Sequence, residues 1–263
     1  MFIDSHCHLD FDAFDPDREA VMQRARDAGV NAFVTISVRV KQFDRVLETA
    51  LAWPHVYCAV GTLPHYADEE TDVTAADLVR IAQHPKVVGI GECGYDRLLG
   101  DAPWDDQVKV FAEHIAAARE TQLPLIIHSV REDAAMAETL EAETRKGAFP
   151  ILIHAFSGQR DFADRVLALG AYCSISGLAT YPEYEYLRDI VRTLPADRIL
   201  VETDAPSQNP GADRDGRNEP ANILTTAQLV ADLRGQTLAE LGAQTTENFY
   251  RLFTRVPRLT PAA

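Results

Sequence analysis

The sequence predicts an α/β fold of the (β/α)8 class, also called a TIM barrel. Short apolar runs alternate with longer amphipathic segments along the whole chain, and strict alternation of strands and helices indicates a parallel sheet. There are eight of these apolar runs, the number that closes such a barrel. A barrel of this class takes about 250 residues, so the 263 residues present suit a single domain over residues 1–263.

The expected strands are brief and rich in aliphatic and β-branched residues, which is typical of parallel strands buried on both faces. The rival arrangement is an open, doubly wound sheet, but no glycine-rich loop of the dinucleotide-binding or P-loop type follows the first run. We therefore favour closure into a barrel. In chain order the expected strands cover residues 2–8, 32–37, 57–61, 87–92, 125–128, 151–154, 171–175 and 199–204.

Amphipathic segments fill the intervals between these strands. The first has Pro16 at its start and Gly29 after its end, which is the usual punctuation of a helix. The longest irregular stretch, 207–218, follows the eighth strand and precedes the last two helices. The expected helices cover residues 16–28, 40–52, 75–83, 104–121, 132–145, 161–169, 182–192, 219–234 and 238–253.

The charge balance limits the kind of nucleic-acid contact that the protein can make. With 25 Lys and Arg against 40 Asp and Glu, the net charge is −15, and no run of basic residues is present. Such a surface repels a phosphate backbone, whereas tight, non-specific binding of long duplexes needs a basic patch. A nucleic-acid substrate would have to be drawn in locally, by metal ions and a few arginines.

Cysteine usage and the first residues of the chain predict a cytoplasmic protein. The four cysteines are scattered without a C-x-x-C pair, which favours reduced, buried thiols. The first residues show no basic region followed by an apolar stretch, so we expect no signal peptide. No apolar run approaches the ~18 residues that a membrane span needs.

Six side chains that can bind metals fall at or near the ends of expected strands. The carboxyl ends of the strands in a barrel share one face, where active sites lie. We therefore expect these side chains to converge at one mouth of the barrel. They are His6, His8, Glu92, His128, His154 and Asp204.

The first two form the pattern His6-Cys7-His8. Alternate residues of a strand point the same way, so both imidazoles are expected to face the barrel axis while Cys7 faces out. Two imidazoles on one side can chelate Zn²⁺, Mn²⁺, Fe or Co. The alternative is a pair of polar residues that merely ends the strand.

Glu92 closes an apolar run, and an unpaired buried carboxylate would be costly. A carboxylate can also bridge two metal ions and hold them ~3.5–4 Å apart. A modified lysine bridges the metals in some barrel hydrolases, but Lys86 lies at the wrong end of its strand. Glu92 is therefore the expected bridge.

His128 and His154 each close an apolar run on consecutive strands. A lone histidine of this kind is usually a core residue bonded to backbone, but two at the same end favour metal binding. Asp204 could bind one metal and take a proton from water, and Glu202, which points the same way, could orient a ligand histidine. The hypothesis is one metal on His6, His8, Glu92 and Asp204, and a second on Glu92, His128 and His154, with Asp204 as general base.

Three arginines lie in or near the expected loops at this mouth: Arg97, Arg131 and Arg217. Arginine suits bidentate contact with phosphate, although an arginine taken singly is more often a surface residue or an ion-pair partner. Arg217 in particular could pair with Glu202 or Asp96 and so fix the last loop.

Six motifs, in order over nearly the whole chain, resemble those of the TatD family of metal-dependent deoxyribonucleases, which belongs to the amidohydrolase-like barrels. The resemblance implies the same six metal ligands and two divalent metal ions. It also implies 3′→5′ nuclease or other phosphodiesterase activity. The motifs are D-S-H-C-H-L at 4–9, G-E-C-G-Y-D at 91–96, L-P-L-I-I-H-S at 123–129, H-A-F-S-G at 154–158, E-T-D-A-P at 202–206 and R-N-E-P at 217–220.

The chain departs from the family pattern near the expected substrate. The third-strand loop of the family usually reads G-x-H-P, but here Leu63 replaces the histidine and leaves His65 as the candidate substrate contact. The arginine that often follows the strand-five histidine by two residues is Val130, with Arg131 next. Further departures at 95–100 and 177–182 resemble a less characterised branch.

Three functions stay open from the sequence. The first is a phosphodiesterase or deoxyribonuclease that acts on single-stranded DNA ends or small phosphodiesters through a water activated by two metals, which could be Mg²⁺, Mn²⁺, Zn²⁺ or Fe. The second is a barrel hydrolase of a carboxylic ester, lactone, amide or aminoacyl ester, because fold does not fix function. The third is a non-catalytic partner protein that retains metals. The predicted substrate contacts are His65, Arg131 and Arg217.

Overall fold

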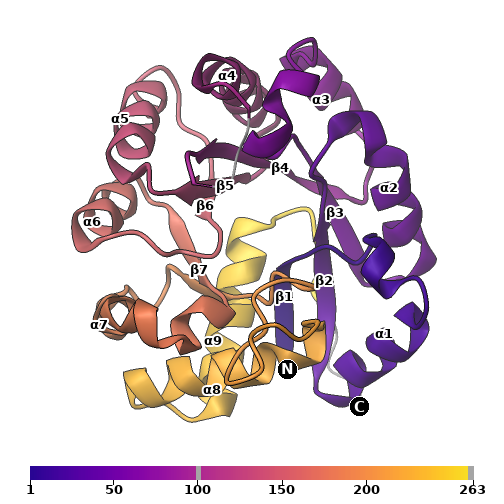
Figure 1. Ribbon diagram of the computed structural model, residues 1–263, viewed down its shortest axis with the longest axis vertical. Helices are drawn as coiled ribbons and strands as arrows, with labels where there is room; N and C mark the ends of the chain where they lie inside the picture. The colour runs from indigo at the N-terminus through magenta and orange to yellow at the C-terminus, as the bar shows by residue number, and fades with distance from the viewer. Residues whose placement is uncertain (99–101, 260–263) are drawn as a thin grey trace.

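A computed structural model describes residues 1–98 and 102–259 of the chain. Eight strands form one parallel sheet whose spatial order is the sequence order, with helices packed outside it (Figure 1). The (β/α)8 barrel is therefore confirmed. The strands are β1 (Phe2–Cys7), β2 (Val30–Ile36), β3 (Val56–Val60), β4 (Val87–Asp96), β5 (Leu125–Val130), β6 (Ile151–Ile153), β7 (Tyr172–Ile175) and β8 (Ile199–Val201).

The barrel closes where the end of β1 meets the residues that follow β8. The backbone N–H of Asp204 donates to the carbonyl of His6 at 2.9 Å, and His8 N–H donates to Ala205 O at 2.8 Å. The carboxylate of Asp4 accepts from the backbone N–H of Thr203 at 3.0 Å and from its hydroxyl at 2.5 Å. These bonds place the first and last strand ends side by side.

The α-helices that surround the sheet agree with the expected segments, and Trp104–Thr121 has the expected bounds. Three expected helices begin instead with a 3₁₀ turn. The α-helices are α1 (Arg18–Asp27), α2 (Phe43–Ala52), α3 (Ala75–Ile81), α4 (Trp104–Thr121), α5 (Asp133–Thr144), α6 (Arg160–Ala168), α7 (Glu185–Thr193), α8 (Ile223–Arg234) and α9 (Leu238–Leu252). The 3₁₀ turns are η1 (Asp12–Phe14), η2 (Val40–Gln42), η3 (Pro64–Glu69), η4 (Gly177–Thr180), η5 (Pro182–Tyr184) and η6 (Pro220–Asn222).

Helix α9 lies inside the ring of the other helices in Figure 1 and closes one end of the barrel. Phe249 and Phe253 pack with residues from the beginnings of the strands, among them Ile3, Val88 and Ile126, in one buried cluster. Burial of such large apolar side chains stabilises this end strongly. Access to the barrel interior is therefore left to the opposite mouth, where the carboxyl ends of the strands lie.

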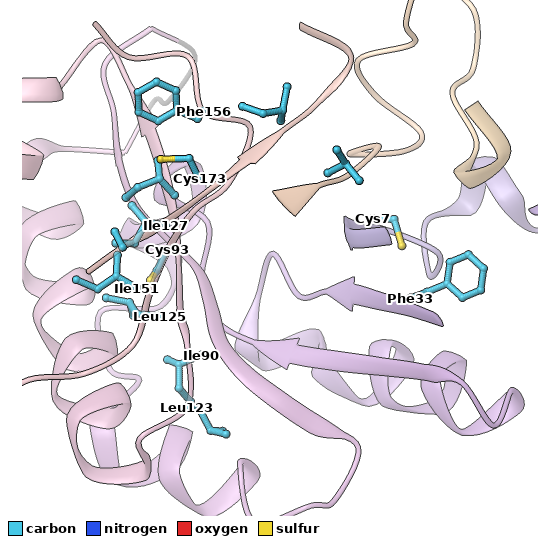
Figure 2. Packing of buried hydrophobic residues seen from close by; sticks show 14 of the residues in the cluster. Cys7, Phe33, Ile90, Cys93, Leu123, Leu125, Ile127, Ile151, Phe156 and Cys173 are labelled. Carbon is cyan, nitrogen blue, oxygen red and sulfur yellow. The ribbon is translucent and has the colours of Figure 1, made fainter. Parts of the chain in front are cut away.

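Alternation along the strands separates two layers of core. On β5, Leu125 and Ile127 pack in the layer between sheet and helices, while Ile126 packs in the barrel interior. Figure 2 shows part of the outer layer, with Leu125, Ile127 and Ile151 in sticks. Because side chains of a strand alternate, His128 points into the interior two residues after Ile126.

The strand ends differ from the expected ones where the site is built. β6 and β8 end before His154 and Asp204, so these two residues lie in the following loops. Glu92 was expected to end its strand, which was wrong, because β4 continues to Asp96 with a break in register between Gly91 and Cys93. This bulge turns the Glu92 side chain toward the other ligands.

The cysteines are free and buried in the described structure. No helix of residues 1–98 or 102–259 is long and apolar enough to cross a membrane.

Candidate metal centre

The structure gathers all six side chains expected to bind metals at the open mouth of the barrel. Every one of them is buried except His128, which is largely so. Two overlapping groups hold donor atoms that all lie within 4.8 Å of one another, and Glu92 belongs to both. The groups are His6, His8 and Glu92, and Glu92, His128 and His154.

Glu92 presents one carboxylate oxygen to each group. Its Oε2 lies 3.4 Å from His6 Nε2 and 3.8 Å from His8 Nε2. Its Oε1 lies 2.8 Å from His128 Nδ1 and 2.8 Å from His154 Nε2. Burial alone would raise the pKa of this carboxyl, but the neighbouring histidines hold it well below its usual value, so the shared group is ionised.

The first group fits a cation better than a hydrogen-bond network. Asp204 Oδ1 lies 3.5 Å from His6 Nε2 and 3.3 Å from His8 Nε2, which is too long for strong hydrogen bonds. Ligands of a tetrahedral metal at ~2.1 Å are about 3.4 Å apart, which matches these separations. In addition, neither ring nitrogen of buried His6 has a hydrogen-bond partner among the described residues, a costly state unless a cation is bound.

The donor atoms of the second group lie closer to one another than those of the first group. The contacts between Glu92 Oε1 and both histidines have hydrogen-bond lengths, so a cation there would replace these bonds and separate the donors slightly. The donor set of two imidazoles and one carboxylate still suits a divalent transition metal. The residues present therefore fit metal ions at both groups.

Backbone and carboxylate partners fix the orientation of two ligand histidines. His8 Nδ1 donates to the carbonyl of Ile36 at 3.0 Å, which turns Nε2 toward Glu92 and Asp204. His154 Nδ1 lies 3.2 Å from Glu202 Oε1, which leaves Nε2 facing Glu92. Glu202 thus contacts His154, as it must if it is to orient this candidate metal ligand.

Asp96 fixes the orientation of His128 in the same way, a role that the sequence did not predict. Its Oδ2 lies 2.8 Å from His128 Nε2, opposite the nitrogen that faces Glu92. The same oxygen lies 2.9 Å from Nε2 of His65, which stands at the edge of the mouth on η3 with its side chain 22% exposed. His65 is therefore linked to the centre through one carboxylate.

Asp204 is hydrogen-bonded by Gln208, a residue that the sequence did not predict at this site. Gln208 Nε2 donates to Asp204 Oδ2 at 2.5 Å, while Oδ1 faces His6 and His8. Burial would raise the pKa of Asp204, but the hydrogen bond with His8 and the charges of His6 and His154 lower it below its usual value. The carboxylate is thus ionised and able to accept a proton.

Four non-glycine residues at this mouth adopt left-handed backbone angles: Arg131 with φ 58°, Ala155 with φ 40°, Asp204 with φ 55° and Gln208 with φ 53°. Arg131 directly follows β5, and Ala155 follows His154. Asp204 is itself a candidate ligand, and Gln208 is its hydrogen-bond partner. Such conformations cost of order 1–3 kcal/mol each and concentrate at functional sites. These conformations lower the stability of the fold, and they set the directions in which the chain leaves the strand ends.

The predicted arginine contacts differ in their surroundings. Arg131 is exposed at the mouth and has no hydrogen bond or ion pair within residues 1–98 and 102–259. Arg97 pairs with Glu132 at 2.9 Å. The suggested pairing of Arg217 with Glu202 or Asp96 was wrong, because its guanidinium pairs with Asp17 at 2.7 and 2.8 Å and fastens the last loop to α1.

Comparison with known proteins agrees with this geometry. The family model described as TatD related DNase matches residues 3–254. The chain is 33% identical over 253 residues to the "Uncharacterized metal-dependent hydrolase YabD" of Bacillus subtilis, with 96% of this chain and 99% of that protein covered. It is 35% identical over 247 residues to the "3'-5' ssDNA/RNA exonuclease TatD" of Erwinia tasmaniensis, with 91% and 95% covered.

The crystal structure of YJJV, a TatD homolog from Escherichia coli, superposes with a TM-score of 0.89 at 33% identity, covering 97% of this chain and 98% of that one. A TatD family hydrolase from Entamoeba histolytica superposes with a TM-score of 0.84 at 19% identity, which shows the shared fold.

Proposed function

Because the chain belongs to the TatD family of metal-dependent hydrolases, we propose that it is a phosphodiesterase that removes nucleotides from the 3′ ends of single-stranded DNA. The observation that carries this proposal is the carboxylate of Glu92, which serves two histidine groups with one oxygen each. That arrangement suits a pair of divalent cations. Many enzymes that cleave phosphate esters by in-line displacement use two such cations.

Two cations would be held by the residues expected from the sequence. The first would bind His6, His8, Glu92 and Asp204, and the second Glu92, His128 and His154. When bound, the cations supply positive charge that polarises the phosphoryl oxygens and makes water acidic enough to attack near neutral pH. Imidazole-rich sites favour Zn²⁺ or Fe²⁺ by affinity, whereas Mg²⁺ and Mn²⁺ are the other candidates.

Asp204 is the general base of the proposed reaction. The oxygen of water bonds to phosphorus while one of its protons passes to Asp204. The bond from phosphorus to the 3′ oxygen of the shortened strand breaks, and its electron pair stays on that oxygen, which takes up a proton and becomes the 3′ hydroxyl. Its lowered pKa keeps it unprotonated before attack, and Gln208 holds the carboxylate from the other side. The Glu92 carboxylate links the two histidine groups, with one oxygen facing each of them.

Substrate contacts are proposed for His65 and Arg131, which both stand at the mouth. His65 can contact the DNA strand while its Nε2 atom stays hydrogen-bonded to the carboxylate of Asp96. Arg131 offers a cation beside the end of β5 that has no partner in the described part of the chain. Arg217 is the third predicted contact, but its ion pair with Asp17 would have to open first.

The name of the Erwinia tasmaniensis relative, a 3′→5′ exonuclease of single-stranded DNA and RNA, supports this choice of substrate. The net charge of −15 also favours short, single-stranded ends over long duplexes, because phosphate must be drawn in locally.

A metal analysis followed by a substrate panel tests the proposal. Purified protein should contain close to two divalent ions per chain and should shorten single-stranded DNA labelled at its 5′ end one nucleotide at a time. It should also cleave bis-nitrophenyl phosphate with Mg²⁺, Mn²⁺ or Zn²⁺, and His128→Ala should lose both activities. Turnover of nitrophenyl acetate with no cleavage of any phosphodiester would overturn the proposal and favour the ester hydrolase.

A further inference from the structure

A cavity of about 570 Å³ opens beside the metal centre, between the ends of β5 and β6 and the segment around η5. We call it the β5–β7 cavity. Its size lies within the range of small-molecule sites, roughly 300–1,000 Å³. The residues that matter for its chemistry are Leu98, Arg131, Asp133, Ser157, Tyr184 and Tyr186.

The position of the cavity ties it to the reaction. Val130 and Arg131 line it and follow His128 by two and three residues, and Ser157 follows His154 by the same three. Both walls therefore begin within three residues of a histidine of the second group. A substrate held at the second group would therefore extend toward this cavity.

The acidic groups of the cavity are already engaged. Glu132 pairs with Arg97 at 2.9 Å, and Glu183 pairs with Arg214. Asp133 accepts the backbone N–H of Gln159 at 2.8 Å.

Arg131 is thus the one charged lining residue that the described structure leaves without a partner. Its left-handed backbone, with φ 58°, sets where its side chain leaves the end of β5. The guanidinium of Arg131 is therefore able to pair with an anionic group of a bound molecule.

The opposite wall is aromatic. The hydroxyl of Tyr186 donates to the carbonyl of Ser157, which fixes that ring. Tyr184 lies beside it with ring centroids 6.1 Å apart, and its own ring is partly exposed. Leu98, which is 46% exposed, adds an unusually accessible apolar side chain at the rim. A flat, apolar group would cover these surfaces.

We propose that the β5–β7 cavity is a subsite for the 3′-terminal nucleotide, with Tyr184 stacked on the base and Arg131 paired with the phosphate. The proposal rests on the proposed function and names the substrate group next to the cleaved bond. A base with a phosphate combines the flat face and the charge that this cavity offers. Stacking on tyrosine tolerates every base, so the subsite accepts ends of any sequence.

Calorimetric titration of the metal-loaded full chain tests the subsite with three probes: deoxyadenosine monophosphate, deoxyribose 5-phosphate and deoxyadenosine. Tyr184→Ala should weaken monophosphate binding about tenfold, within the range for base–aromatic stacking, whereas Tyr184→Phe keeps the ring and should bind normally. Neither tyrosine variant should change the binding of deoxyribose 5-phosphate.

Arg131→Gln should weaken both phosphates about tenfold, as expected for loss of a charge-assisted contact, and should leave deoxyadenosine unchanged. The matched control is Arg80→Gln, which removes a charge from an exposed arginine on α3, away from the cavity. Equal binding by Tyr184→Ala and Tyr184→Phe, or by Arg131→Gln and Arg80→Gln, would overturn the subsite.

Hydrolysis of oligonucleotides separates this proposal from the proposed function. Single strands with an adenine or an abasic residue at the 3′ end should differ in KM for wild type but not for Tyr184→Ala. If DNA is shortened with one KM for both ends and all variants, the function stands and the subsite is wrong. If no phosphodiester is cleaved while the three probes bind as expected, the nucleotide site stands and the proposed function is wrong.

Discussion

The Nδ1 atom of His154 lies 3.2 Å from Oε1 of Glu202, and the same oxygen accepts the backbone N–H of Ala155 at 2.7 Å. The carboxylate therefore holds both the ring and the strained residue that follows it. Glu202→Ala should lower the affinity of the second cation about 10–100-fold, the usual effect of losing a partner of a ligand histidine. Competition with a chelating dye measures this. Glu138→Ala, on an exposed face of α5, is the control, and equal affinities would contradict the role of Glu202.

Gln208 is predicted to position Asp204. Gln208→Leu removes the hydrogen bond to Oδ2 and lets the carboxylate rotate. Loss of a hydrogen bond to a charged group costs about 1.5–3 kcal/mol, so kcat should fall roughly tenfold or more. KM should stay near its wild-type value, because Gln208 does not line the proposed nucleotide cavity, and metal should be retained through His6, His8 and Glu92. A variant that loses metal in step with kcat would show that Gln208 acts on metal binding instead.

The convergence of the two histidines of the second group was predictable because each stands on or just after a regular strand. Leu152 packs in the barrel interior, so His154, two positions on, faces the same way, and the same holds for Ile126 and His128. Simple alternation along an apolar run is enough to find such residues.

The missed residues lie where alternation fails. Asp96 lies beyond the expected end of its strand at residue 92, on the part of β4 that follows the break in register against β5. Gln208 lies in an irregular loop, where no periodicity reports the direction of a side chain. The partner of Arg217 was also beyond prediction, since Asp17 is 200 residues away and meets it only after the barrel closes.

Gly94 is predicted to be required by the close approach of β4 to β5 beside His128. It has φ 140°, and a Cβ atom there would lie 2.1 Å from the carbonyl oxygen of His128. Gly94→Ala should lower the free energy of unfolding by about 3 kcal/mol or more, since neither backbone can yield without breaking the sheet. Urea unfolding measures this.

Gly170→Ala provides the matched control for that substitution. Gly170 has φ 83°, but a Cβ atom there would meet nothing within 4 Å. It should therefore show only the cost of a left-handed residue, about 1–2 kcal/mol. If both variants lost the same stability, close contact with β5 would not be the reason for glycine at position 94.

His114 predicts a specific pH dependence of stability. It is fully buried on α4, its Nε2 accepts the backbone N–H of Thr62 at 3.0 Å, and its Nδ1 donates to Val110 O at 2.8 Å. Burial is the main cause that lowers its pKa from 6.5 to about 4. The unfolded chain therefore takes up a proton at this histidine below pH 6.5, while the folded protein does so only near pH 4. The contribution is complete above pH 6.5 and is lost as pH falls toward 4, by about 3 kcal/mol in all.

Chemical unfolding of wild type and His114→Gln at intervals from pH 7.5 to 4 checks this prediction. Glutamine can keep a hydrogen bond but does not titrate, so the variant should lose less stability over this range than wild type. The difference in slope should be confined to the interval between about pH 6.5 and 4, because outside it the folded and unfolded states bind the same number of protons at this site. His55→Gln, at an exposed position, should follow wild type. Parallel stability curves for wild type and His114→Gln would mean that the acid sensitivity of the fold arises from other groups.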